Sequence, residues 1–159
     1  MKYLLFLSLA CMVMTVTDAQ KIVPITHNGV KYEVLDLSAK GRIPWGGYTA
    51  IPGDAARSES DGSSNSAAIV ATVGNNENYK GKLYAAKLCS KAKDGGKEDW
   101  YLPAYNETDI IYAFKDKFDV EEKGSIWSST EANGTQAYTK YWYNGSFYKS
   151  QKVQDYYTL

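Results

Sequence analysis

The stretch DWYLPAYNETDIIYAF, residues 99–114, places two aromatic residues and a Leu-Pro pair directly before a polar segment that turns apolar at helical spacing. A proline holds the residue before it extended and is tolerated at the first turn of a helix. We therefore predict a strand-like segment over residues 100–102, then a helix with an apolar stripe of Ile110, Ile111, Phe114 and Phe118. Whether the bulky residues at its entry serve the fold or a ligand is the first question that the sequence raises.

The segments on either side of this stretch predict an α+β domain. Before it, KYEVLDL (31–37) follows the turn signal Asn28-Gly29 and predicts a hairpin. A long loop is expected over residues 40–64, held in place by Trp45 and Tyr48. Two helices follow it. The first is SNSAAIVATVG (64–74), capped by Asn65 or Ser66, and the second covers residues 79–96 and ends at Gly95-Gly96. After it, four short β segments, 125–131, 136–143, 145–151 and 153–159, predict an antiparallel meander with turns at Asn133-Gly134 and Asn144-Gly145.

The first nineteen residues have the pattern of a secretory signal. Lys2 is followed by an apolar run to Val16, and Ala19 provides a small residue before a cleavage site at Gln20. The alternative is a lipoprotein signal in which Cys11 carries the lipid and anchors the protein to a membrane. Either reading leaves residues 20–159 as one domain and predicts a secreted, periplasmic or cell-surface protein.

The charges and the cysteines exclude several classes of function. Lys and Arg number 18, as do Asp and Glu, so we expect no nucleic-acid partner, which requires a clustered basic excess. Cleavage after Ala19 leaves Cys89 as the one cysteine, which excludes an intramolecular disulfide. The one histidine, His27, lies far from Cys89 in sequence, so we expect a buried structural thiol rather than a nucleophile.

Several segments together resemble one protein family. DGSSNSAAIVA (61–71), YAAKLC (84–89), GGKEDWYLPAYNE (95–107) and IWSSTE (126–131) occur in the family's order, followed by an AY…NG…K pattern. They resemble the Lcl C-terminal domain family, a domain of unknown function, from about residue 45 to the end. The resemblance implies a compact C-type-lectin-like fold with two to three helices and an antiparallel meander, and it implies no catalytic residues.

The shared motifs are expected to be structural. In such a fold Trp100 and Leu102 would anchor the corner between the extended segment and the helix. The motif residues are Trp100, Leu102, Pro103, Glu107, Trp127, Ser128, Ser129, Thr130 and Glu131. The chain departs from the family in two places. Ala104 replaces a hydroxyl residue, which breaks a capping box with Glu107, so Asn106 with Asp109 is expected to cap the helix one turn later. The final strand lacks the family's Arg-containing stretch.

Two chemical sites suggested by these motifs are weighed and set aside. WSSTE holds hydroxyls beside a carboxylate, but no base is near in sequence, so Ser128, Ser129 and Thr130 are expected to bond the backbone of a tight loop, with Glu131 bonding nearby amides. The triplets 131–133 and 142–144 faintly echo the calcium ligands of sugar-binding lectins but lack a proline and an aspartate, respectively. We therefore expect no metal and no cofactor, with calcium as the remaining alternative.

The aromatic residues near the C-terminus suggest a binding surface. In a strand, alternate residues share a face, so Tyr141 and Tyr143 should point away from Trp142. The candidate ligand-binding residues are Tyr141, Tyr143, Asn144, Tyr148, Lys149 and Gln151. They favour a non-catalytic, adhesion-type protein that binds a glycan or a surface protein. The alternatives are an assembly subunit of a surface structure and an enzyme distantly related to the formylglycine-generating enzymes.

Overall fold

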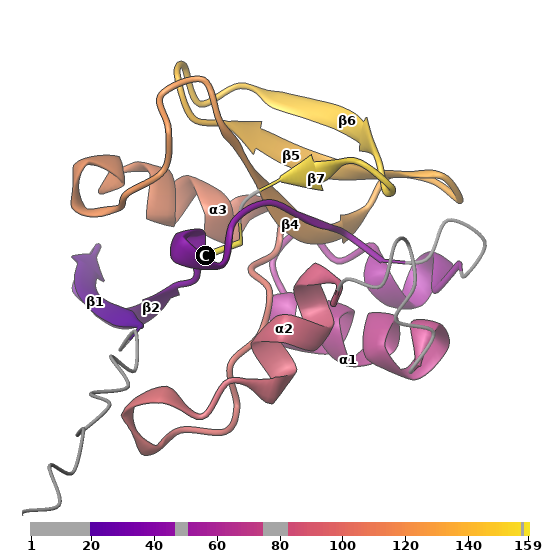
Figure 1. Cartoon of the computed structure of the whole chain (residues 1–159), viewed down its shortest axis with the longest axis horizontal. Helices are drawn as coiled ribbons and strands as arrows, with labels where there is room; N and C mark the ends of the chain where they lie inside the picture. The colour runs from indigo at the N-terminus through magenta and orange to yellow at the C-terminus, as the bar shows by residue number, and fades with distance from the viewer. Residues whose placement is uncertain (1–19, 47–50, 75–82, 157) are drawn as a thin grey trace, which may run out of the picture.

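The computed structural model describes residues 20–46, 51–74, 83–156 and 158–159, and it confirms an α+β fold. The predicted leader, with Cys11, and Tyr48 lie outside the described residues. The strands and helices, with 3-10 helices written η, are β1 (Lys21–His27), β2 (Val30–Asp36), η1 (Ser38–Lys40), β3 (Ile43–Pro44), η2 (Gly53–Ala56), α1 (Gly62–Val73), α2 (Ala85–Lys91), η3 (Asp94–Gly96), α3 (Tyr105–Tyr112), η4 (Lys115–Lys117), β4 (Ser125–Glu131), β5 (Gln136–Tyr141), β6 (Phe147–Gln151) and β7 (Asp155–Tyr156). Figure 1 shows β4, β5 and β6 on one side of the molecule, α1 and α2 on the other, and the β1–β2 hairpin at one end.

The predicted hairpin is confirmed. β1 and β2 pair antiparallel from Lys21 opposite Asp36 to His27 opposite Val30. Asn28 and Gly29 both have positive φ, at 49° and 79°, as a two-residue turn of a twisted hairpin requires. This local turn chemistry fixes the register of the whole hairpin.

The predicted meander is confirmed for three strands and wrong for the fourth. β4, β5 and β6 form an antiparallel sheet, but β7 leaves it and pairs with β3, Ile43 opposite Tyr156. The β3 segment is held close to β4 by two indole hydrogen bonds: Trp45 Nε1 donates to the Ser128 carbonyl at 2.8 Å, and Trp127 Nε1 donates to the Ile43 carbonyl at 2.9 Å. The predicted loop over residues 40–64 therefore contains a strand, and Trp45 does anchor it.

Helix α1 begins earlier than predicted. Its N-cap is Asp61, whose carboxylate accepts from the Ser64 N–H at 2.9 Å; these hydrogen bonds lower the pKa of Asp61. The predicted caps Asn65 and Ser66 are instead buried inside the helix. Their side chains bond to neighbouring segments, so an interior packing role takes precedence over their capping propensity. Gly74 ends the helix as predicted.

Helix α2 is shorter than predicted. It ends at Lys91, and Gly95 and Gly96 lie in η3; residues 79–82 are outside the described part of the chain. The buried residues of α2 are Ala85, Ala86 and Cys89, and Leu88 is half-buried. Cys89 is 3% exposed, and burial raises the pKa of its thiol to about 12. It is a buried, protonated thiol, as expected.

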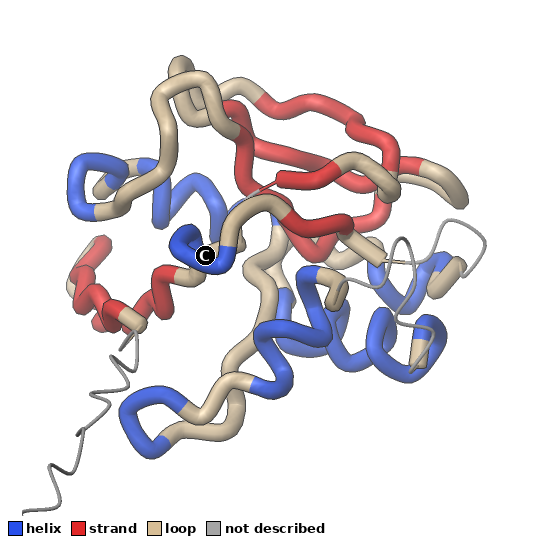
Figure 2. Tube along the Cα trace, viewed as in Figure 1, coloured by secondary structure: helices blue, strands red, loops and turns tan. Residues whose placement is uncertain are grey.

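The entry segment before α3, residues 100–104, is a loop that pairs with none of the described strands, so the predicted strand-like conformation is wrong (Figure 2). Leu102 is fully buried, and its N–H donates to Ser66 Oγ at 2.9 Å while its carbonyl accepts from the same hydroxyl at 3.2 Å. Trp100 is only half-buried, and Tyr101 is 39% exposed. Leu102 therefore anchors the corner, as the resemblance implied, whereas the two aromatic residues lie partly at the surface.

The capping of α3 also differs from the expectation. Glu107 Oε2 accepts from the Ala104 N–H at 2.7 Å, so half of the capping box survives without a hydroxyl residue. Asn106 is not a cap: it lies inside the helix, and its amide donates to Ser60 Oγ at 2.8 Å.

Two hydrophobic clusters form the core. The first packs α1 and α2 against β3 and β4 around Trp45 and Trp127, and the second packs the hairpin against α3 around Ile111 and Trp142. Within the described residues, no helix combines the length and the apolar character needed to cross a membrane.

Candidate ligand-binding surfaces

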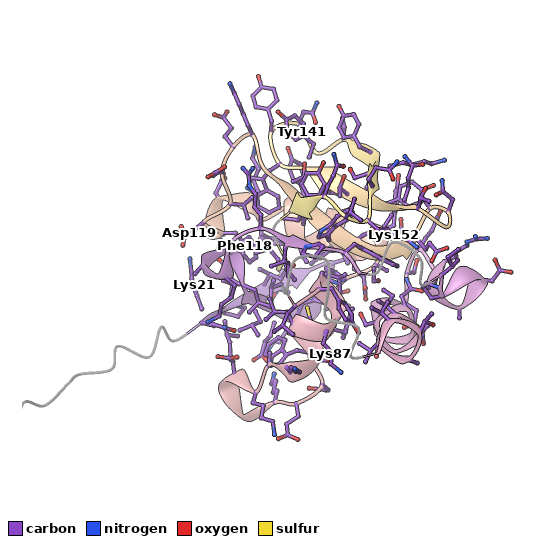
Figure 3. All side chains as sticks on the ribbon, turned by 45° about the vertical axis from the view of Figure 1, so that its right-hand side comes forward. Lys21, Lys87, Phe118, Asp119, Tyr141 and Lys152 are labelled. Atoms are coloured by element: carbon purple, nitrogen blue, oxygen red, sulfur yellow. The ribbon has the colours of Figure 1, made fainter. Side chains whose placement is uncertain are left out.

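Three of the candidate residues form an exposed group that we call the tyrosine patch: Tyr141, Tyr143 and Tyr148. Tyr143 is 57% exposed and Tyr148 is 52% exposed, while Tyr141 is half-buried between them. The Tyr141 ring centroid lies 6.3 Å from that of Tyr143 and 6.0 Å from that of Tyr148. Figure 3 shows Tyr141 on the outer side of the meander, away from the core.

The backbone beneath the patch is held firmly. Trp142 is 4% exposed, its ring packs edge-on against Tyr112 at 5.8 Å, and its N–H donates to the Gly124 carbonyl at 2.9 Å. Gly145 has φ +72°, and a Cβ there would lie 2.6 Å from the Tyr112 ring. The turn that presents Tyr143 therefore requires a glycine at this position.

The remaining candidates are divided between the two sides of β6. Asn144 is exposed next to Tyr143, and its Oδ1 accepts from the Ser146 N–H at 3.0 Å. Lys149 and Gln151 alternate with Tyr148 along the strand and so lie on the opposite face. There the Lys149 ammonium lies 5.8 Å from the Tyr138 ring centroid. The structure does not bring Lys149 and Gln151 to the tyrosine patch.

The WSSTE residues lie in the buried strand β4, so the predicted tight loop is wrong. Their hydroxyls are engaged because β4 is covered on both faces. Ser128 Oγ donates to the Tyr138 carbonyl at 3.1 Å, and Ser129 Oγ accepts from Asn65 Nδ2 at 3.2 Å. Thr130 Oγ1 donates to the Ser58 carbonyl at 2.8 Å and accepts from the Tyr105 N–H at 3.0 Å. No hydroxyl of this motif is available to a substrate.

Glu131 forms a buried ion pair rather than a set of amide bonds. Its Oε2 lies 3.1 Å from Lys152 Nζ, and both side chains have zero exposure. Desolvation lowers the pKa of Lys152, and the bond to Glu131 opposes that shift. The predicted amide bonding is limited to Gly53 N at 3.4 Å, because Lys152 and, at 3.7 Å, Arg57 occupy the space around the carboxylate.

Side-chain oxygens of both calcium-like triplets have other partners: in the second triplet, Asn144 Oδ1 accepts from the Ser146 N–H at 3.0 Å. Glu131 is paired with Lys152, and Asn133 Oδ1 accepts from the N–H groups of Thr135 and Gln136 at 3.0 and 2.9 Å. In the part of the chain that the structure describes, no three metal-binding side chains of the His, Cys, Asp or Glu type lie close together.

A pocket that the sequence did not predict lies between the hairpin and the entry segment of α3. We call it the hairpin pocket; it encloses about 380 Å³. Its walls are residues 31–35 of β2, parts of the segment 97–103, and Glu107, Ile110 and Ile111 of α3. The aromatic residues Trp100 and Tyr101 are the feature of the sequence that could have indicated a site here. The wall that faces them belongs to a hairpin distant in sequence, so the pocket itself could not be predicted.

Polar groups converge at the mouth of this pocket. Lys97 and Glu33 form an ion pair across it, and Tyr101 Oη donates to Glu107 Oε1 at 3.0 Å. Desolvation, followed by the nearby Glu107 carboxylate, raises the pKa of Tyr101 to about 12. The phenol therefore stays protonated and serves as a hydrogen-bond donor at neutral pH.

The patch and the pocket are built from different residues, and none of the six candidate ligand-binding residues lines the pocket. No protein-family model, curated protein or solved structure matches the chain. Function is therefore inferred from the residues of this chain and their geometry.

Proposed function

We propose that the chain is a secreted or surface-exposed, non-catalytic protein that binds a carbohydrate on the tyrosine patch. The observation that carries the proposal is the grouping of Tyr143 and Tyr148, each more than half exposed, around Tyr141. A sugar ring has an apolar face that stacks on an aromatic ring, and hydroxyls that accept and donate hydrogen bonds. Tyrosine rings and the Asn144 amide provide both kinds of contact.

The rigidity of the patch supports a recognition role. Two side-chain torsions position each tyrosine, and the strands beneath are fixed by the buried Trp142 and by the turn at Gly145. A site that is ordered before binding loses little conformational entropy when the ligand arrives. The proposal of export rests on the leader pattern, and the proposal of a C-type-lectin-like fold rests on the sequence motifs.

Two observations support a non-catalytic role. The hydroxyls of Ser128, Ser129 and Thr130 are buried in β4 with backbone or side-chain partners. The Cys89 thiol is buried, and its raised pKa disfavours the nucleophilic thiolate at neutral pH.

A glycan array tests this proposal. The wild type and a Tyr143→Ala/Tyr148→Ala variant are compared with and without a calcium chelator. The matched control is Val30→Ala/Ile51→Ala, which removes two apolar side chains of similar exposure, 52% and 54%, from other surfaces. We expect selective glycan binding that falls at least about tenfold in the tyrosine variant, is retained in the control, and does not depend on calcium.

Two results would contradict the proposal: glycan binding that the tyrosine variant retains, or a folded protein that binds no glycan. The second result would favour the assembly role, in which the tyrosine patch contacts another protein.

A further inference from the structure

We propose that the hairpin pocket binds an extended peptide segment of another protein, which adds as a strand along the free edge of β2. The peptide places one apolar side chain between the two core clusters. This inference is separate from the carbohydrate proposal, because the pocket and the tyrosine patch share no residue.

The first support is the free edge of β2. This strand pairs with β1 alone, and no other described strand bonds to its second edge. All five residues from 31 to 35 line the pocket. Side chains along a strand alternate between faces, so a cavity that touches five successive residues lies along the strand's edge. Unpaired N–H and C=O groups at such an edge are the binding site for an added strand.

The second support is the opposite wall. Residues 97–101 are extended or irregular, and among the described residues no backbone hydrogen bond joins 98–101 to another segment. The Lys97–Glu33 ion pair crosses the mouth, but its side chains are 45% and 44% exposed. Such an exposed pair contributes little to stability and can open for a peptide.

The floor of the pocket determines the anchor side chain. It is built from both core clusters, Leu35, Leu37 and Cys89 from the first and Ile25, Val34 and Ile111 from the second. Tyr32, Trp100 and Tyr101, which are partly exposed, also line the pocket. A cavity of about 380 Å³ with this lining accepts a large aliphatic or aromatic side chain.

The charges on the two walls determine the residues that flank the anchor. Lys31 on β2 and Asp99 on the opposite wall are both exposed, and their side chains form no ion pair or hydrogen bond with the described residues. A peptide complements them when an acidic residue faces Lys31 and a basic residue faces Asp99. The occupant is therefore a peptide with an apolar anchor flanked by charges of opposite sign.

A display experiment tests the charge rule. A library of random decapeptides on phage is selected against three forms of the whole protein: the wild type, a Lys31→Glu/Asp99→Lys variant, and a Glu122→Lys/Lys123→Glu control. The two variants keep the net charge, and all four positions are exposed. We expect the wild type and the control to enrich peptides with the same charge order around an apolar residue, and the first variant to enrich the reversed order.

Amide hydrogen exchange with an enriched peptide tests the strand geometry. Alternate amides of residues 31–35 should slow at least tenfold, and the Tyr143→Ala/Tyr148→Ala variant should bind the peptide as the wild type does. Three results would overturn the proposal. The first is no enrichment of peptides on the wild type, and the second is the same charge order in the peptides enriched on the wild type and on the Lys31→Glu/Asp99→Lys variant. The third is peptide binding without slower amide hydrogen exchange in β2. The last result would indicate a pocket for a free apolar group.

Discussion

Glu107 joins the N-termini of two helices that are far apart in sequence. Its Oε2 accepts from the Gly62 N–H of α1 at 3.1 Å as well as from the Ala104 N–H at the start of α3. The first N–H groups of a helix have no partner within the helix, and the partial positive charge there favours a carboxylate. One side chain thus fixes the corner between α1 and α3, on which one wall of the hairpin pocket depends.

Removal of this carboxylate should destabilise the fold. Glu107→Ala leaves two backbone donors without their partner, so we expect the free energy of unfolding to fall by about 1–3 kcal/mol. Glu107→Gln retains one oxygen that can accept from both amides, so its free energy of unfolding should fall by less. Urea denaturation of the three proteins measures the difference, and equal losses in the two variants would contradict the bridging role of the oxygen.

The approach at Gly62 leaves no room for a side chain. A Cβ there would lie 2.5 Å from Glu107 Oε2 and 2.7 Å from both Ala104 N and Leu102 O. Because two of these atoms belong to the backbone, relief requires the corner to move, and we expect Gly62→Ala to cost about 1–3 kcal/mol. Ser63→Ala, at the next position, which is exposed, is the matched control. Equal melting temperatures of the two variants would contradict the close packing at Gly62.

The buried Lys152–Glu131 pair should show strong coupling. Lys152→Met leaves the carboxylate buried without its main cation, which typically costs about 3–5 kcal/mol. Adding Glu131→Leu removes the stranded charge, so the double variant should be more stable than Lys152→Met alone. A double-mutant cycle by chemical denaturation measures this coupling, and additive losses would show that the pair contributes no specific interaction.

Alkaline pH should destabilise the protein through Cys89. The pKa of this thiol rises from 9.0 to about 12 on burial, so the folded state keeps a proton that the unfolded state loses. The resulting stability is complete below pH 9 and declines as pH rises through the window between 9 and 12. At pH 10.5 the decline is about 2 kcal/mol.

A Cys89→Val variant isolates this effect, since it removes the ionisation and keeps an apolar side chain. The difference in unfolding free energy between the wild type and this variant should shift against the wild type by about 2 kcal/mol between pH 8 and pH 10.5. The raised pKa values of Tyr84, Tyr101 and Tyr105 also lower the unfolding free energy as pH rises, and the lowered pKa of Lys152 raises it. Both proteins contain these residues, so their contributions cancel in the difference. A difference that is independent of pH would show that Cys89 is not buried as described.

The features that the sequence predicted correctly depend on neighbouring residues. The hairpin turn at Asn28-Gly29 and the helix stop at Gly74 follow from the φ angles that these residues adopt readily. Trp142 is buried and Tyr143 exposed, as expected, but β5 ends at Tyr141 and both residues lie in the turn that follows, so the geometry of a strand does not explain this arrangement.

The features that the sequence did not predict depend on distant segments. β7 pairs with β3 because the indoles of Trp45 and Trp127 hold β3 against β4, and no local pattern encodes that pairing. Asn65 is a strong capping residue, yet it lies inside α1 because its amide bonds Ser58 and Ser129. The hairpin pocket is lined by the hairpin region, Cys89, residues between 97 and 111, and Leu159, and no local pattern in the sequence brings these separated residues together.

The most direct measurement of the central claim is an NMR titration of tyrosine ring signals with the glycan that binds best on the array. The carbohydrate proposal predicts saturable shifts of the Tyr141, Tyr143 and Tyr148 rings, with the rings of Tyr32 and Tyr101 in the hairpin pocket unchanged. Shifts confined to Tyr32 and Tyr101, or no shifts at saturating glycan, would contradict it.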